Sequence, residues 1–191
     1  MTTGLVVVTA LRSEYAALRG QVPGATIERC GMGVARVRQW LPRVAELQPS
    51  AVAVAGVAGG LDPSLRPGDI VVATEVRDDR GRTVLRAAAP LVAELRRLGL
   101  RVRCGPMVSC DHIVSSQEDR ERLAATGALA VDMESAEIVR ALDKGPDRVP
   151  VAVVRVIVDT AYTPVARLNT LPAGAKALRV LRRIGPALQR W

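Results

Sequence analysis

The sequence predicts a single α/β domain in which a central, twisted, mostly parallel sheet is flanked by helices. Short runs of Val, Ala and Ile alternate with helical patterns from end to end. Several of these runs are apolar at every position, which is typical of strands buried on both faces. The chain has 191 residues without a linker or a repeat, so residues 1–191 are expected to form one domain around one core.

The expected elements follow in chain order from the hydrophobic pattern. Strands are expected at residues 4–9, 25–30, 51–55, 69–74, 102–108, 128–131 and 150–157, and helices at residues 12–19, 33–47, 88–98, 117–126, 133–143 and 174–189. Pro63, Pro67 and Gly68 separate the third strand from the fourth. The polar stretch 77–83, RDDRGRT, is expected to be an exposed loop or a hairpin tip.

The chain is strongly basic, with a formal net charge of +8 at pH 7. Such a charge suits nucleic acid, an anionic membrane surface or a phosphorylated substrate. Nucleic acid is not expected as a partner, because the chain has no Phe and only two Tyr and two Trp to stack on bases. No apolar run is long enough to span a membrane, and the first residues have the pattern of a strand rather than of a signal peptide. A cytoplasmic protein is therefore expected.

The sequence offers few side chains for a metal. The three cysteines lack CxxC spacing and are odd in number, so neither a disulfide framework nor a zinc site is indicated. His112 is the only histidine, and one histidine rarely makes a metal site. No metal is expected, and His112 is interpreted as a loop or pocket-wall residue.

Three carboxylates, Glu14, Glu134 and Asp159, stand at the end of an apolar strand or just after one. Open α/β sheets bind their ligands at the C-terminal ends of the strands. Burial there raises the pKa of a carboxyl group, so that it can hold or take a proton near neutral pH. A carboxylate such as Glu134 can also accept two hydroxyl hydrogen bonds, as holding a ribose diol requires. The alternative for Glu134 is helix capping together with Asp132.

Two glycine segments and one arginine complete the candidate site. The turn 31–33 opens a helix with Arg36 one turn in, and it is either an anion site or a plain strand-to-helix turn. The segment 56–60, GVAGG, either brings backbone N–H groups close to a ligand or is a tight packing turn. Arg155 lies in an apolar strand, so it is expected either to act at the site or to pair structurally with a carboxylate.

These segments together resemble the nucleoside phosphorylase and nucleosidase superfamily. The resemblance is carried, in the family's order, by TALRSE, GMGVAR, GVAGGLDPSLRPGDIVVATE, MVSCD, VDMESAEI and VRVIVDTA. The early glutamate resembles that of methylthioadenosine/S-adenosylhomocysteine nucleosidases. The strings GGLDPSLRPGD, VSCD and VDMES, with Leu171-Pro172-Ala173, resemble most closely the hopanoid-associated phosphorylase-like group, whose members are linked with removing adenine from adenosylhopane.

The resemblance implies cleavage of the N-glycosidic bond of a purine nucleoside, with adenine as the expected base. Asp159 resembles the acid that protonates purine N7, and Glu134 the carboxylate that binds the ribose hydroxyls, with Met133 under the sugar. Glu14 matches the carboxylate that activates water, and Arg155 the arginine near the nucleophile. The resemblance implies a homodimer and does not imply a cofactor.

The remaining roles that the resemblance implies concern the base and the nucleophile. Ile113 and Val114 match the segment whose backbone reads the adenine edge, and Gly59 is expected to contact substrate. Gly33, Arg36 and Val57 would form a phosphate or nucleophile site.

This sequence departs from the family's pattern at several positions. Val57 stands where many relatives have a Ser that contacts the nucleophile, and Ile113 where an aromatic often stacks on the base. Val158 stands where Ser or Asn is common. Because Glu14 would repel phosphate, hydrolysis is favoured. Phosphorolysis, with inorganic phosphate as co-substrate and a ribose 1-phosphate product, stays the alternative.

The short connection 74–91 predicts an open 5′ side of the pocket that accepts a large apolar substituent. The C-terminal pattern predicts a basic amphipathic helix with Leu178, Leu181, Ile184 and Leu188 on one face. Such a helix either contacts a membrane surface peripherally or packs on the sheet. A non-catalytic nucleoside- or membrane-binding module and a nucleoside deoxyribosyltransferase are the other function classes considered.

Overall fold

The computed structural model describes residues 3–143, 149–160 and 170–191. Its strands are β1 (Thr3–Thr9), β2 (Thr26–Arg29), β3 (Pro49–Gly60), β4 (Ile70–Asp78), β5 (Gly81–Val84), β6 (Val102–Ser109), β7 (Ala130–Asp132) and β8 (Val151–Thr160). Its helices are α1 (Arg12–Leu18), α2 (Val34–Leu47), α3 (Ala88–Arg97), α4 (Gln117–Ala124), α5 (Ser135–Asp143), α6 (Thr170–Arg183) and α7 (Gly185–Arg190). The expected alternation of strands and helices is confirmed.

The strands form one mixed sheet that closes on itself. The strand order is β2-β1-β3-β7-β6-β4-β5, and β8 pairs with both β3 and β4. The path β3–β8–β4–β6–β7 therefore returns to β3 through the antiparallel pairing of β3 with β7. Five of the eight pairings are parallel. This closure brings the C-terminal ends of β1, β3, β7 and β8 to one end of the molecule.

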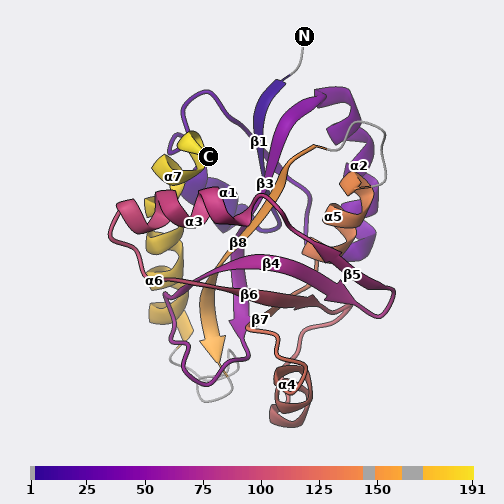
Figure 1. Ribbon diagram of the computed structural model, residues 1–191, viewed down its shortest axis with the longest axis vertical. Coiled ribbons are helices and arrows are strands. Elements are labelled where there is room, and N and C mark those ends of the chain that lie inside the picture. The colour runs from indigo at the N-terminus through magenta and orange to yellow at the C-terminus, as the bar shows by residue number, and fades with distance from the viewer. Residues whose placement is uncertain (1–2, 144–148, 161–169) are drawn as a thin grey trace.

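Helices cover the sheet on two sides, and α4 stands apart at one end (Figure 1). Helices α2 and α5 contribute Trp40, Ile138 and other side chains to one apolar cluster. A second cluster receives side chains of α1, α3, α6 and α7. The burial of Val, Ala and Ile on both faces of β1, β3 and β8 explains why these strands read as continuous apolar runs.

Two segments differ from the expectation in detail. The glycine segment 56–60 is not a turn, because β3 continues through it to Gly60 beside β8. Residues 77–83 form the tip of the antiparallel β4–β5 hairpin, so the hairpin interpretation is confirmed and β5 is an additional strand. Glycines and charged residues have low strand propensity, which hides both strand segments in the sequence.

The C-terminal helical pattern folds as two helices, with the break at Ile184 and Pro186 near the start of α7. The side chains of Leu181, Ile184 and Leu188 are fully buried in the core. The alternative in which this stripe packs inside the protein is therefore confirmed, and the arginines at 179, 182 and 183 stay exposed. Among the residues that the structure describes, no helix is long and apolar enough to cross a membrane.

Candidate active site

A cavity of about 270 Å³ lies at the C-terminal ends of β1, β3, β7 and β8. All three carboxylates expected at the site line it. The expected residues that line the cavity are Glu14, Val57, Gly59, Ile113, Val114, Met133, Glu134 and Asp159. A larger cavity of about 500 Å³, beside β5 and the start of β8, contains none of the three carboxylates. The chemistry of the molecule is therefore concentrated in the smaller cavity.

Glu14 is held in place by backbone N–H groups. It lies in the first turn of α1, and only 1% of its surface is exposed. Its Oε2 accepts hydrogen bonds from the N–H groups of Ala10 at 2.9 Å and Leu11 at 2.8 Å. Its Oε1 accepts one from the N–H of Val57 at 2.7 Å. Val57, whose side chain has no hydroxyl group, thus contributes its backbone N–H to the position of Glu14.

Arg155 is paired with Asp132, a residue that the sequence suggested only as a helix cap. The Arg155 Nε and Nη2 atoms lie 2.9 Å and 2.8 Å from Asp132 Oδ2, and Nη2 also donates to Ser135 Oγ at 3.0 Å. Burial alone would lower the pKa of Arg155, but the neighbouring carboxylates, led by Asp132, raise it above its ordinary value. Arg155 is therefore a permanent cation, and it is not among the residues that line the cavity.

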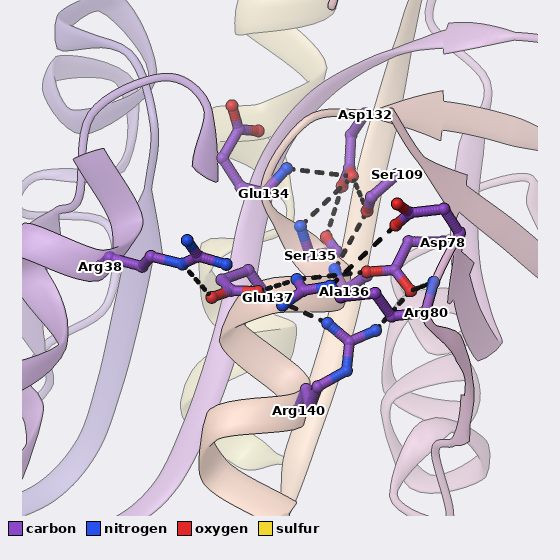
Figure 2. A network of polar contacts seen from close by, with 11 residues as sticks. Arg38, Asp78, Arg80, Ser109, Asp132, Glu134, Ser135, Ala136, Glu137 and Arg140 are labelled. Carbon is purple, nitrogen blue, oxygen red and sulfur yellow. Dashed lines mark hydrogen bonds and ion pairs between the residues drawn. The ribbon is translucent and has the colours of Figure 1, made fainter. Parts of the chain in front are cut away.

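Asp132 is the centre of a buried polar group. It accepts hydrogen bonds from the hydroxyls of Ser109 and Ser135 and from the backbone N–H groups of Glu134 and Ser135. Figure 2 shows these contacts, with the Glu134 carboxylate pointing away from them. Helix α5 is anchored next to this group because Glu137 bonds Arg38 of α2 and Arg80 of the hairpin turn (Figure 2).

Glu134 lines the cavity, and its pKa is raised. It is 5% exposed, and its Oε1 accepts a hydrogen bond from the Gly33 N–H at 2.8 Å. Burial raises the pKa of Glu134 to about 7, although Arg155, 3.7 Å away, acts in the opposite direction. Glu134 can therefore exchange a proton near neutral pH.

The turn 31–33 does not present a free anion site. The Gly33 N–H that such a site would use is donated to Glu134. Arg36 is exposed, bonds Gln39 at 3.2 Å and is not among the residues that line the cavity. The structure thus brings Gly33 to the site through Glu134 and leaves Arg36 outside it.

Asp159 is the second-last residue of β8, pairs with Gly59 of β3 and is 2% exposed. It forms an ion pair with Arg120 of α4, whose Nη1 also donates to the Gly60 carbonyl at 3.3 Å. The apolar surroundings expected for Asp159 are thus interrupted by a cation. Sequence reasoning missed Arg120, although its spacing of three from Leu123 places both on the buried face of a polar helix.

The outer part of the cavity is apolar and exposed. Met32 and Ile113 line it with 51% and 65% of their surface exposed, and His112 lies beside them with a hydrogen bond to Asp111. Within the described residues, no cluster of three His, Cys, Asp or Glu is placed to hold a metal ion. The arrangement joins an acidic inner end, suited to hydroxyl groups and proton transfer, to an apolar rim.

Comparison with known proteins places this geometry in a family. The fold matches that of a mutant of Helicobacter pylori MTAN with 5′-methylthioadenosine in the active site, at 18% identity, a TM-score of 0.86 and 98% coverage of both chains. Futalosine hydrolase of H. pylori matches at 18% identity and a TM-score of 0.86, covering 98% of this chain and 97% of that one. The 5′-methylthioadenosine/S-adenosylhomocysteine nucleosidase of Neisseria meningitidis, in complex with methylthio-immucillin-A, matches at 19% identity and a TM-score of 0.81, with 97% and 96% coverage. Because the sequence also matches the phosphorylase superfamily over residues 7–185, the chain belongs to that superfamily.

Proposed function

We propose that this protein hydrolyses the N-glycosidic bond of an adenine nucleoside. Breaking this bond passes through an oxocarbenium-like transition state, in which the leaving base needs a proton and the sugar carbon needs a nucleophile. Three buried carboxylates, from α1, the β7–α5 connection and β8, converge on one cavity, and each has a different set of partners. Superfamily membership and the nucleosidases among the structural neighbours support the reaction class.

Each carboxylate takes one role in this proposal. Asp159 delivers a proton to N7 of the base, and Glu134 accepts hydrogen bonds from the ribose hydroxyls above Met133. Glu14 takes a proton from the attacking water. The backbone at Ile113 and Val114, which also line the cavity, contacts the edge of the base.

The hydrogen bonds that Arg155 makes inside the protein support water rather than phosphate as the nucleophile. An arginine that binds phosphate needs free donors directed at the anion. Here Nε and Nη2 of Arg155 are bonded to Asp132 and Ser135, and the side chain is 1% exposed. Glu14 would add repulsion toward an anion at the same place.

Product identification tests the hydrolysis directly. An adenine nucleoside incubated with the enzyme should give free adenine and free ribose at the same rate with and without inorganic phosphate. The Asp159→Asn variant should lose on the order of 10²–10⁴-fold in kcat, the usual contribution of a general acid. Adenine release that requires phosphate and yields ribose 1-phosphate would establish phosphorolysis instead, and no release from any purine nucleoside would leave a binding module.

The rim supports a nucleoside with a large apolar 5′ substituent, of the kind found in adenosylhopane. Met32 and Ile113 are exposed apolar side chains that line the cavity. A substituent that covers them would remove their surface from water, which favours binding. This specificity is a proposal separate from the hydrolysis and has its own test below.

A further inference from the structure

Arg120 occupies an unusual place for a charged side chain. Helix α4 is otherwise polar and stands at one end of the molecule (Figure 1), capped by the Ser116 hydroxyl. Only Arg120 and Leu123 of this helix are buried. Arg120 is 4% exposed and lines the catalytic cavity together with Gly59 and Asp159.

Arg120 forms an ion pair with Asp159, but not all of its nitrogen atoms have hydrogen-bond partners. Nη2 pairs with Asp159 Oδ2, and Nη1 reaches the Gly60 carbonyl at 3.3 Å. Nε is buried and has no hydrogen-bond partner among the described residues. A buried donor without a partner costs stability, and a buried ion pair is often replaceable by apolar side chains without loss. The fold alone therefore gives little reason for an arginine at this position.

Gly59 makes the approach of the two groups possible. A Cβ atom at Gly59 would lie 3.3 Å from both Arg120 Nη1 and Asp159 Oδ1. That is closer than most Cβ contacts, so any larger side chain on β3 would press on the pair. The glycine segment of β3 thus serves the packing of side chains at the site.

The ion pair between Arg120 and Asp159 opposes the uptake of the proton that Asp159 is proposed to donate. An arginine is charged at every pH of interest, and a neighbouring cation favours the ionised form of a carboxyl group. Glu14 and Glu134 face the same cavity and favour the protonated form by like-charge repulsion, and His112 lies at the exposed rim. Arg120 is in direct contact with Asp159, so its charge acts on the Asp159 carboxyl group at short range.

We propose that Arg120 is a positioning residue that holds Asp159 as a carboxylate and thereby sets the upper pH limit at which Asp159 donates its proton. The inference rests on the proposed function. In the step concerned, the Asp159 O–H bond breaks and an N7–H bond forms, while the C1′–N9 bonding electrons pass to the base. The proton is taken from solvent before the step, and the nearby guanidinium opposes its uptake.

The pH profile of kcat/KM separates this role from a structural one. In Arg120→Met, kcat/KM on an adenine nucleoside should fall at a pH about one to three units higher than in the parent enzyme. This is the range of pKa shift that one close opposite charge produces. Arg120→Lys, which keeps the charge, should lose activity near the same pH as the parent. Arg122→Met is the matched control, since Arg122 lies on the same helix, is 68% exposed at its side chain and pairs with Asp119. A folded Arg120→Met enzyme whose kcat/KM falls at the same pH as in the parent, with a uniform loss at all pH values, overturns the proposal.

A second measurement does not depend on activity. The side-chain carboxyl of Asp159 can be followed by ¹³C NMR in labelled protein and assigned with Asp159→Asn. Its titration midpoint should rise in Arg120→Met and in Arg120→Gln, which gives a second neutral side chain if the first variant does not fold. If no purine nucleoside is cleaved but the midpoint rises, the proposed function fails and the Arg120 assignment stands. If nucleosides are cleaved and the midpoint is unchanged in a folded variant, only the Arg120 assignment fails.

Discussion

The three carboxylates at this site have different partners. Glu14 meets three backbone N–H groups, Asp159 meets Arg120, and Glu134 meets one N–H and a more distant cation. Burial dominates for Glu134, whose pKa is raised to about 7. Three carboxyl groups of one cavity thus have different electrostatic surroundings.

The raised pKa of Glu134 predicts a pH-dependent stability difference. The pKa lies above the ordinary value of 4.5, so between about 4.5 and 7 the folded protein keeps a proton that the unfolded chain has lost. Glu134 therefore contributes less to stability as pH rises through this window. Glu134→Gln cannot ionise, so its Tm relative to the parent should improve from pH 5 to pH 8, although activity falls. Thermal unfolding of both proteins at the two pH values measures this, and an equal Tm difference at both would show that Glu134 does not titrate in this range.

At the scale of elements, strand β3 extends further than expected and leaves room for side chains of its neighbours. A Cβ atom at Gly56 would clash with Nη1 of Arg155 and Oε1 of Glu14, which belong to β8 and α1. The bare backbone of β3 at this point leaves room for a carboxylate and a cation from two neighbouring elements. The apolar run before Gly56 predicted the strand, but glycines carry no strand signal, so its continuation to Gly60 was missed.

Gly56→Ala should therefore damage both fold and catalysis. The new methyl group must displace two side chains that are each 1% exposed, and overpacking of this kind costs about 1–3 kcal/mol. A shift of Glu14 by about 1 Å should lower kcat/KM by on the order of 10²-fold. Denaturant unfolding and kinetics should be compared with Gly4→Ala in β1, where a Cβ atom would meet nothing within 4 Å. If Gly56→Ala keeps the stability and the rate of the parent, neither the fold nor catalysis requires the close packing of Glu14 and Arg155 against Gly56.

Other elements show why part of the site could not be predicted from the sequence. Asp159 and Glu134 were found because carboxylates at the ends of apolar strands stand out. Arg120 lies in a helix of mostly charged residues, so no contrast marks it, and only its spacing from Leu123 gives a signal. Asp132 sits two residues before Glu134 and reads as a helix cap until its partner on β8 is known.

At the scale of the whole molecule, sheet closure creates the site. The antiparallel contact of Gly59 and Gly60 with residues 130–131 joins segments about 70 positions apart, and no local pattern specifies it. The buried arginines 120 and 155 are each matched by a carboxylate, and among the described residues Arg120 is the one arginine that lines the cavity. The charge that suggested an anionic partner in the sequence therefore gives no support to a phosphate site here.

Closure also assembles the apolar rim from two distant segments, the turn before α2 and the connection before α4. Met32, Ile113 and Val84 are the three exposed large hydrophobic side chains of the described residues, and the first two flank the cavity. If the rim holds an apolar 5′ substituent, the Met32→Ser, Ile113→Ser double variant should lose roughly tenfold in kcat/KM on a nucleoside with such a substituent, through weaker burial of apolar surface. Adenosine, which lacks the substituent, should lose much less.

Val84→Ser is the matched control for this test, because Val84 is 60% exposed but lines the separate cavity beside β5. Parallel assays of adenosine, methylthioadenosine and adenosylhopane then rank the substituents by size. A parent enzyme that prefers adenosine, or a double variant that loses equally on all three substrates, would show that the rim does not contact the substituent. A loss that grows with the apolar area of the substituent would instead locate the 5′ group between Met32 and Ile113, because only contacts made by the substituent can scale with its surface.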